Sequence, residues 1–307
     1  MSVRAQLAAT ALWLLASAAS AQELRTTHVA DGIYMITGAG GNVTVSVGSS
    51  GVMVVDSGSA AASDALLAAI RAVSDAPIRY VLNTGVRPEY IGGNVALRHA
   101  GATFTGGNAT VVAGVDVGAA IVAHENALKR MAGDDVAIDA QPTETFYVPK
   151  LDLYFNGEPV ELFHQPATVD DTGLFVHFRR SDVIATGDFF RVDRYPFIDV
   201  EHGGSIDGII DALNALVDLA VSDTLAEGGT LLVPGRGRVC DEGDLVRYRD
   251  MVTMIRDRVR TLLERGQTLQ QIKAAKPTLD FESRYGRDPG WNGDDFIEAV
   301  YRSLSAT

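Results

Sequence analysis

The side chains best suited to chemistry in this sequence lie in the stretch from Val81 to Asn94, which reads V-L-N-T-G-V-R-P-E-Y-I-G-G-N. Arg87, Glu89 and Tyr90 bring a permanent cation, a carboxylate and a phenol close together. Such a set suits a functional site, and it equally suits a tight polar turn. The chemistry of the three side chains leaves both interpretations open.

The neighbouring residues indicate where this set lies in the fold. The apolar run from Ile78 to Leu82 predicts a buried strand, and Gly85 and Pro88 favour a turn directly after it. A helical pattern begins after Asn94. We therefore expect the polar side chains on a loop at the end of a buried strand, where α/β proteins commonly place functional residues.

The same stretch resembles the signature loop of the metallo-β-lactamase superfamily, Asn-Thr-His-x-His-x-Asp-His-x-Gly-Gly-Asn. In that family the His and Asp side chains of the loop bind zinc. The positions kept from the frame of the loop are Asn83, Thr84, Pro88, Gly92, Gly93 and Asn94. The resemblance pairs the family's ligand positions with Gly85, Arg87, Glu89 and Tyr90, so that no histidine stands there.

Two further loops complete the metal site in the family. A zinc-binding His follows a Pro-Ala pair there, and Thr168 stands at that position here. Asp188 matches the carboxylate that bridges two zinc ions, whereas Arg236, in Pro-Gly-Arg-Gly, replaces the last His. Asp56 matches an Asp that supports the metal loop from below, and it would equally serve as a turn former at a strand end.

These replacements change the electrostatics that the resemblance implies. Without metal, Glu89 and Asp188 would be repelling carboxylates, and Arg87 and Arg236 would supply compensating charge. We therefore expect a salt-bridged cluster of these four side chains in place of the metals, with no zinc bound. If the ion pair of Arg236 in this cluster is buried, Arg236→Ala is expected to lower the free energy of unfolding by roughly 3–5 kcal/mol.

Other residues offer different chemistry. His124, His164 and His202, with Glu89 and Asp188, keep open a rearranged or mononuclear metal site, although each lone His is also explained by ordinary packing. Beside Arg87, Tyr90 would act as a base or nucleophile if its pKa were lowered. Two further residues, Asp170 and Asp171, suit either acid–base chemistry or a turn.

The composition and the first residues indicate which partners are excluded and where in the cell the protein is expected. The net charge of −13 argues against nucleic acid and anionic membrane surfaces as partners. Arg4, the apolar run Leu7 to Leu15 and the small residues before Ala21 form a signal-peptide pattern, which predicts cleavage after Ala21 and a periplasmic or secreted protein. Cys240 is the only cysteine of the sequence, so no intramolecular disulfide forms.

The remaining pattern predicts two groups of strands, each followed by helices. Strands are expected at Gly32 to Thr37, Asn42 to Val47, Val52 to Val55, Ile78 to Leu82, Leu151 to Phe155, Pro159 to Phe163, Leu174 to Phe178, Val183 to Ala185 and Thr230 to Val233. Helices are expected at Ser59 to Ser74, His124 to Met131, Ser205 to Ala220, Glu242 to Arg265, Leu269 to Ala275 and Asp294 to Leu304. The stretch Val111 to Val122 is compatible with helix, strand or lid loop.

The resemblance extends from Gln22 to Leu304 and implies an α+β fold, a single-domain four-layer αββα sandwich over residues 22–307. We interpret the chain as an exported pseudoenzyme of this fold that binds a small anionic ligand through Arg87, Glu89, Tyr90, Thr168, Asp188, Arg236 and His202. The alternative is a hydrolase of lactams, esters or thioesters with a rearranged metal site, in which Tyr90 and Asp188 are the catalytic candidates and zinc the cofactor. The sequence leaves the oligomeric state open.

Overall fold

The strands of this protein form two sheets in the computed structural model, which describes residues 23–103, 118–224 and 228–305. The first sheet follows chain order, with β1 (Arg25–Ala30), β2 (Ile33–Ala39), β3 (Gly41–Gly48), β4 (Gly51–Val55), β5 (Ile78–Leu82), β6 (Ala120–His124) and β7 (Glu144–Phe146). The second is ordered β12 (Leu231–Val233), β11 (Val183–Ala185), β10 (Leu174–Phe178), β9 (Glu158–His164) and β8 (Lys150–Phe155). The predicted signal peptide, residues 1–21, lies outside the described residues.

The core between the sheets follows from strand alternation. In β4, Met53 and Val55 face the second sheet, while Val52 and Val54 face the opposite way. Successive side chains of a strand point to opposite faces, so a strand covered on both sides is apolar throughout. This explains why Gly51–Val55 is buried along its whole length. In β10, Leu174 and Val176 pack into the same inter-sheet core.

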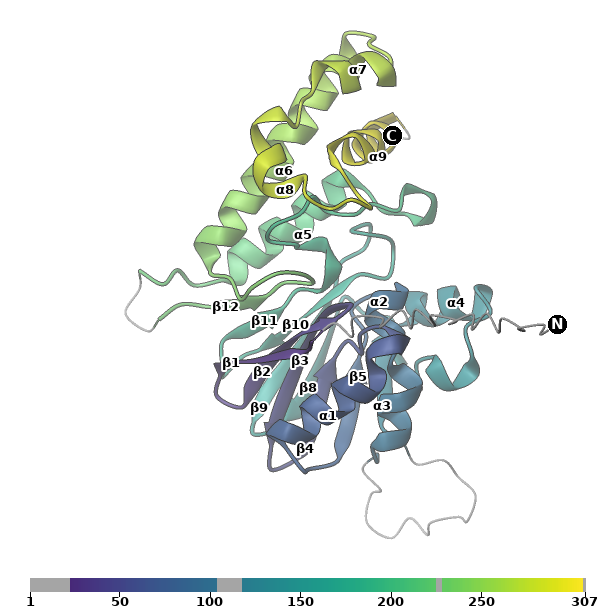
Figure 1. Cartoon of the computed structure of the whole chain (residues 1–307), viewed down its shortest axis with the longest axis vertical. Helices are drawn as coiled ribbons and strands as arrows, with labels where there is room; N and C mark the ends of the chain where they lie inside the picture. Colours follow the sequence, from purple (N-terminus) through teal and green to yellow (C-terminus); the bar gives the residue numbers. More distant parts are fainter. Residues whose placement is uncertain (1–22, 104–117, 225–227, 306–307) are drawn as a thin grey trace, which may run out of the picture.

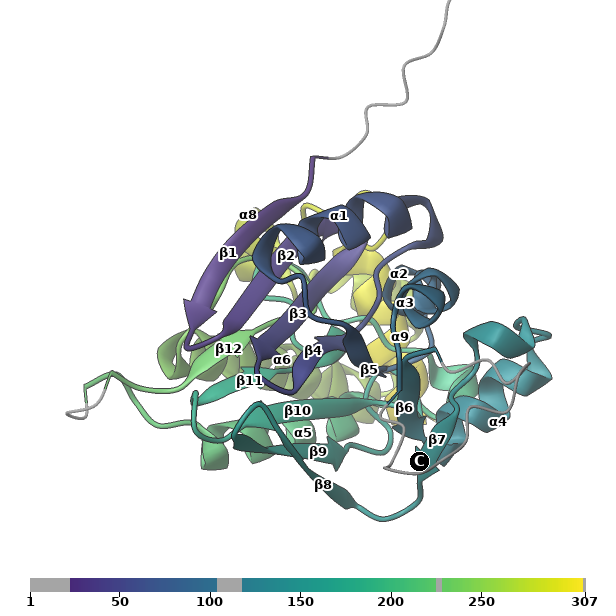
Figure 2. The ribbon, with the colours of Figure 1, turned by 90° about the horizontal axis from the view of Figure 1, so that it is seen from below.

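Helices cover the outer face of each sheet. On the first sheet lie α1 (Ser63–Val73) and α3 (Asn94–Ala100), through Leu66, Ile70 and Leu97. On the second lie α5 (Ile206–Leu219), α6 (Glu242–Glu264) and α9 (Gly293–Ser305). Figure 1 shows these two groups of helices on opposite sides of the sheets, and Figure 2 shows the strands between them. The predicted αββα sandwich is confirmed.

The structure also differs from the sequence prediction at particular elements. The strands β1 and β7 were not predicted, and β6 includes the end of the ambiguous stretch, of which residues 111–117 lie outside the described residues. Short helical elements α2 (Pro88–Ile91) and α8 (Glu282–Tyr285) were also missed. The expected helices α4 (Glu125–Gly133) and α7 (Leu269–Ala275) are present. None of the helices in the described part of the chain is long and apolar enough to span a membrane.

Strand direction brings the candidate loops together. The pair β4 and β5 is parallel, and so is the pair β11 and β12. The carboxyl ends of parallel strands lie at one edge of a sheet, where open α/β sheets place their ligands. Asp56, the loop after Leu82, the turn at Asp188 and the loop at Arg236 all follow these strand ends. A backbone hydrogen bond from Asn42 to Gly235, 2.9 Å long, joins the two sheets at this edge.

Candidate functional site

The Asp188 carboxylate is bound by Arg191, which was not among the predicted site residues. The turn after β11 places Arg191 so that its Nε lies 2.6 Å from Asp188 Oδ1 and its Nη2 lies 2.8 Å from Oδ2. The Asp188 side chain is 8% exposed and the Arg191 side chain 2%. This is a buried, bidentate ion pair, the geometry in which a guanidinium binds a carboxylate most strongly.

Two residues of the signature loop complete the shell around Asp188. Arg87 Nη1 donates to Asp188 Oδ2 at 2.6 Å, and the Tyr90 hydroxyl donates to Oδ1. Burial raises the pKa of Asp188, but the charges of Arg191 and Arg87 outweigh it and hold that pKa below its ordinary value. The Asp188 carboxylate is therefore ionised and accepts hydrogen bonds on both oxygens.

Glu89 joins this network through Arg87. Arg87 Nη2 donates to Glu89 Oε1 at 3.0 Å, so one guanidinium bridges the two carboxylates. Arg236 approaches Glu89 only to 3.7 Å and donates instead to the carbonyl of Gly40 at 2.6 Å. The expected cluster thus forms around Arg87, while Arg191 occupies the place beside Asp188 that was expected for Arg236.

The loop that carries these side chains contains a helical turn rather than the expected irregular loop. Arg87 is the N-cap residue of α2, and Pro88 occupies its first turn. Proline suits this position because its missing N–H would be unpaired there in any case. The turn points Glu89 outward, with a side chain 34% exposed, and leaves Tyr90 buried.

Tyr90 is packed too tightly to titrate easily. A Cβ atom at Gly41 would lie 2.3 Å from Tyr90 Cε1, so the ring fits only because residue 41 is a glycine. Burial, followed by the charge of Asp188, raises the pKa of Tyr90 well above its ordinary value. The expectation of a lowered pKa was wrong, because burial and the charge of Asp188 outweigh the charges of the nearby arginines. A neutral phenol donates a hydrogen bond here and is a poor base.

The residues that match the family's loop frame have a structural role here. Asn94 Nδ2 donates to Asn83 Oδ1 at 2.8 Å, and Asn83 Nδ2 returns a bond to Asn94 Oδ1 at 3.1 Å. Ser57 Oγ also donates to Asn94 Oδ1, at 2.8 Å. These buried amides lock the strand ends of β4 and β5 to the start of α3. The frame therefore positions the loop whatever side chains the loop carries.

Asp56 supports the loop from below, as the resemblance implied. Its carboxyl oxygens accept from Thr84 N at 2.8 Å and from Thr84 Oγ1 at 2.7 Å. Burial raises the pKa of Asp56 to about 7, and the negative charge of Asp188 adds to the rise. This residue also adopts a φ of 63°, the left-handed conformation that Asp tolerates better than most residues.

The space between the predicted ligand positions is nearly filled by protein atoms. A cavity of about 10 Å³ remains between Thr84, Gly85, Tyr90, Thr168 and Asp188, no more than one water molecule needs. Thr168 is fully buried, and its Oγ1 lies 3.3 Å from the carbonyl of Gln165. Of the side chains that bind Asp188, Arg87 and Tyr90 line this remaining space.

The histidines lie in other surroundings. The rings of His124 and His164 stack with centroids 3.5 Å apart, and His164 Nε2 lies 2.9 Å from the carbonyl of Asp171. Burial, followed by the charge of His164, lowers the pKa of His124 to about 4. Stacked parallel rings direct their nitrogens side by side rather than toward one ion. His202 Nδ1 lies 2.6 Å from Asp199 Oδ2, and His202 is exposed.

The two aspartates after Thr168 have turn and ion-pair roles. Asp170 accepts from Thr172 N at 2.8 Å and from Thr172 Oγ1 at 2.5 Å, which is a local turn. Asp171 pairs with Arg130 at 2.7 Å. Arg130 also donates to the carbonyl of His202 at 3.3 Å. Asp171 therefore belongs to a separate polar group beside α4, together with Arg130 and His202.

The donor set at the carboxyl edge does not suit zinc. Zinc requires neutral imidazole, thiolate or carboxylate, usually from three or four side chains. In the described residues, no group of three or more His, Cys, Asp or Glu side chains is arranged to hold a metal ion. Asp188 offers both its oxygens to guanidinium and phenol donors, and Arg87 and Arg191 would repel a cation.

A pocket opens outward from this network, and most of its lining was not anticipated. Its volume is about 300 Å³, and we call it the mouth pocket; its lining consists of Arg87, Glu89, Arg191, Arg194, Phe197, Arg236, Asp288, Gly290 and Trp291. The Arg87 guanidinium lies 4.1 Å from the centroid of the Phe197 ring. The Phe197 and Trp291 rings are 4.6 Å apart. The run from Asp188 to Phe197, with two arginines and four aromatic residues after a predicted strand end, was the available signal.

Comparison with known proteins supports the fold. No protein-family model matches the sequence, and no curated protein does. Among solved structures, the sec-alkylsulfatase Pisa1 from Pseudomonas sp. matches 91% of this chain at a TM-score of 0.68 and 16% identity. The chain spans 50% of the length of that sulfatase.

Two metallo-β-lactamases match as well. That from Pontibacter korlensis gives a TM-score of 0.57 at 13% identity, over 75% of this chain and 99% of its own. The DIM-1 metallo-β-lactamase gives 0.56 at 15% identity, over 75% and 97%. The protein therefore has the metallo-β-lactamase fold.

Proposed function

We propose that this protein is an exported pseudoenzyme of the metallo-β-lactamase fold, in which an ion-pair network replaces the zinc centre and which binds a small anionic molecule. The observation that carries this proposal is the engagement of Asp188. Both of its oxygens accept from Arg191, one also from Arg87 and the other from Tyr90. A metal ion would have to displace these donors from a buried site.

The electrostatic balance supports the same conclusion. A buried carboxylate without a counter-charge costs several kcal/mol, and zinc or arginine can compensate it. Here the compensation comes from Arg191 and Arg87, within the protein itself. A pseudoenzyme can keep the fold and the loop geometry in this way while losing the ion.

The mouth pocket supports the anionic ligand. Arg194 and Arg236 line it with guanidinium groups, and Phe197 and Trp291 form an apolar wall. Its two carboxylates are already paired, Glu89 with Arg87 and Asp288 with Arg194. Among the residues that the structure describes, the Arg236 side chain makes one close hydrogen bond, to the carbonyl of Gly40, so most of its five donors remain for a ligand. A neighbour in fold is named an alkylsulfatase, and an alkyl sulfate combines an anionic group with an apolar chain in the same way.

The hydrolase alternative receives less support from the geometry. Its metal would need His124 and His164, whose rings stack on each other, or His202, which pairs with Asp199. Its nucleophile would be Tyr90, whose pKa is raised. These observations favour a binding role over hydrolysis.

Export rests on the first residues of the sequence. Arg4, the apolar run after it and the small residues before Gln22 fit a cleavable signal. Expression of the full chain with fractionation, followed by mass spectrometry of the exported form, tests this: we expect an N-terminus at Gln22, and an uncleaved chain retained inside the cell would contradict export.

The binding role is tested by thermal unfolding with single anions, namely acetate, sulfate and inorganic phosphate at matched ionic strength. A saturable rise in Tm is expected, because a ligand that binds only the folded state stabilises it. Phe197→Leu, which removes part of the apolar wall and the contact with Arg87, is expected to weaken the effect. A Tm that follows only ionic strength would contradict this site.

A further inference from the structure

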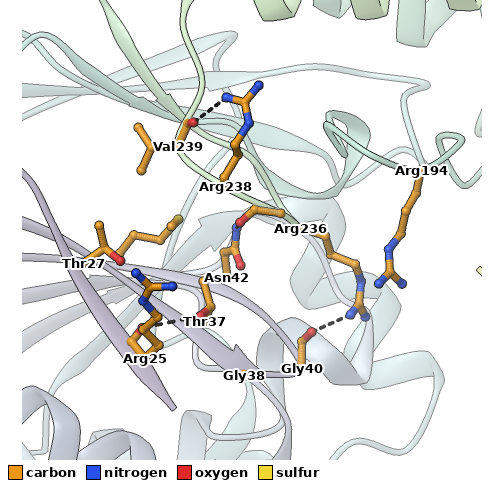
Figure 3. Close-up of a pocket in the computed structure, with 12 residues that line it drawn as sticks. Arg25, Thr27, Thr37, Gly38, Gly40, Asn42, Arg194, Arg236, Arg238 and Val239 are labelled. Carbon is orange, nitrogen blue, oxygen red and sulfur yellow. Dashed lines mark hydrogen bonds between the residues drawn. The ribbon is translucent and has the colours of Figure 1, made fainter. Parts of the chain in front are cut away.

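A second cavity lies beside the mouth pocket, at the other side of the loop after β12. Its volume is about 530 Å³, and β1, β2, the turn before β3 and residues 236–239 enclose it. Four arginines line it, namely Arg25, Arg194, Arg236 and Arg238. We call it the arginine cleft; Figure 3 shows its side chains.

The charge of this cleft is one-sided. Within the described part of the chain, no Asp or Glu belongs to its lining, although the whole protein carries a net charge of −13. Arg194 pairs with Asp288 at 2.9 Å, and Arg238 pairs with Asp244 at 2.6 Å. These two arginines therefore have a protein counter-charge.

The other two arginines are less compensated. Arg236 lies 3.7 Å from its nearest carboxylate oxygen, on Glu89, and among the described residues Arg25 makes no ion pair at all. Figure 3 shows Arg25 on one side of the cleft and Arg236 with Arg194 on the other. Two cationic ends thus face the same cavity from different elements.

The part of the cleft between Arg25 and Arg236 is polar but uncharged, and hydrogen bonds of Asn42 connect its floor to the loop above. Thr27 and Thr37 bring hydroxyl groups, while Met35 and Val239 bring apolar surface. Asn42 Nδ2 donates to the carbonyls of Pro234 at 2.8 Å and Gly237 at 3.0 Å, which ties the floor of the cleft to the loop above it. A volume of about 530 Å³ suits a small organic molecule rather than a single inorganic anion.

We propose that the arginine cleft binds an organic anion with two separated oxyanion groups, carboxylates or phosphates, one at Arg25 and the other at Arg236. This inference rests on the proposed function, because Arg194 and Arg236 line both the cleft and the mouth pocket. It extends that function by naming a ligand with two charged ends and an uncharged body. Guanidinium groups bind both oxyanions bidentately, so the shared chemistry is the oxyanion.

The test is a calorimetric titration of the mature chain with two kinds of probe. Citrate and a sugar bisphosphate carry several charged groups, and acetate and inorganic phosphate are the single-group controls. At equal ionic strength, at least one of the two larger probes is expected to bind about tenfold or more tightly than its single-group control. Whether citrate or the bisphosphate binds more tightly distinguishes carboxylate from phosphate ligands.

Three variants locate the binding. Arg25→Gln changes a residue of the cleft that the mouth pocket lacks, and it is expected to weaken binding of the larger probe by about tenfold, the scale of one charge-assisted hydrogen bond. Arg236→Gln is expected to weaken it similarly. Arg71→Gln, an exposed arginine on α1, removes the same charge elsewhere and is expected to leave binding unchanged.

The outcomes separate this inference from the proposed function. If the larger probe binds but Arg25→Gln leaves its affinity unchanged while Phe197→Leu weakens it, the ligand sits in the mouth pocket and the cleft inference is overturned. If the single-group anions bind as tightly as the larger probes, the second charged end is refuted. If no anion binds, both proposals fail together.

Discussion

Arg191 binds both carboxylate oxygens of Asp188 from three residues further along the chain, at 2.6 and 2.8 Å. The short turn after β11 brings the guanidinium back over the carboxylate, and both side chains are buried. Asp188 matches the residue that bridges two zinc ions in metal-binding members of the family. In this protein it is the acceptor at the centre of a network of arginine and tyrosine donors.

Removal of Arg191 is expected to destabilise the fold strongly. Arg191→Met leaves the charge of Asp188 buried with only Arg87 beside it, and the free energy of unfolding should fall by roughly 3–5 kcal/mol, measured by urea denaturation. Adding Asp188→Asn should restore part of this loss, because the buried charge is then gone. The control Lys129→Met breaks an exposed ion pair with Glu125 and should cost about 0.5 kcal/mol. A loss below about 1 kcal/mol for Arg191→Met would show that the pair contributes little.

Arg236→Ala is expected to have a much smaller effect than the sequence alone suggested. Arg236 lies 3.7 Å from Glu89, and both side chains are partly exposed, at 21% and 34%. We expect a loss of about 1 kcal/mol in the same urea experiment, chiefly from the hydrogen bond to Gly40. If Arg236→Ala proves as damaging as Arg191→Met, the assignment of Arg191 as the main partner is mistaken.

Asp56 should give stability a specific dependence on pH. Its pKa rises from 3.8 to about 7 in the folded chain, so between these values the folded protein holds a proton that the unfolded chain has released. The contribution of this proton to the free energy of unfolding is therefore fully present below about pH 4 and is lost as the pH rises through 7. Asp56→Asn lacks the titration and keeps an acceptor for Thr84 N.

The measurement is the difference in unfolding free energy between the parent protein and Asp56→Asn across this range. The parent should lose up to about 4 kcal/mol relative to the variant between pH 4 and pH 7. His124 and Asp188 titrate in both proteins and largely cancel in the difference. A difference that stays constant with pH would rule out a raised pKa at Asp56.

Restoring zinc binding should require one substitution in addition to the five histidines that the family motif indicates. The fivefold variant replaces Gly85, Arg87, Tyr90, Thr168 and Arg236 by histidine, but Arg191 still holds both oxygens of Asp188. Adding Arg191→Ala frees that carboxylate, and zinc affinity in a calorimetric titration should rise about tenfold or more. Circular dichroism confirms that each variant is folded. Equal zinc affinity with and without Arg191→Ala would mean that Arg191 does not block the site.

The sequence predicted what depends on local pattern. The β-branched runs of β2, β3 and β4 and the turn at Asn156, with its φ of 51°, were placed correctly because alternation and turn chemistry act over a few residues. The strand β1 was missed because it lies at a sheet edge and is largely exposed, so it lacks an apolar run. The strand β7 has only 3 residues and gave no pattern.

The sequence placed several of the site residues near one another but did not predict how they pair. The signature loop located Arg87 and Tyr90, and the match at a second strand end located Asp188; the structure brings the three together. The family match gave no indication of Arg191, because Arg191 lies outside the positions that were matched to the metal ligands. The stacking of His124 on His164 and the cleft at Arg25 join residues far apart in the chain, and only the packing of the two sheets determines such contacts.

The most direct test of the central claim is metal content. The mature protein, purified without chelator and then exposed to zinc and desalted, should contain well under one equivalent of metal per chain by inductively coupled plasma mass spectrometry, because Arg191 and Arg87 occupy Asp188. The variant with the five histidines and Arg191→Ala serves as the positive control. One or two equivalents of zinc or iron in the unmodified protein would contradict the account and direct attention to His124, His164 and His202 as ligands.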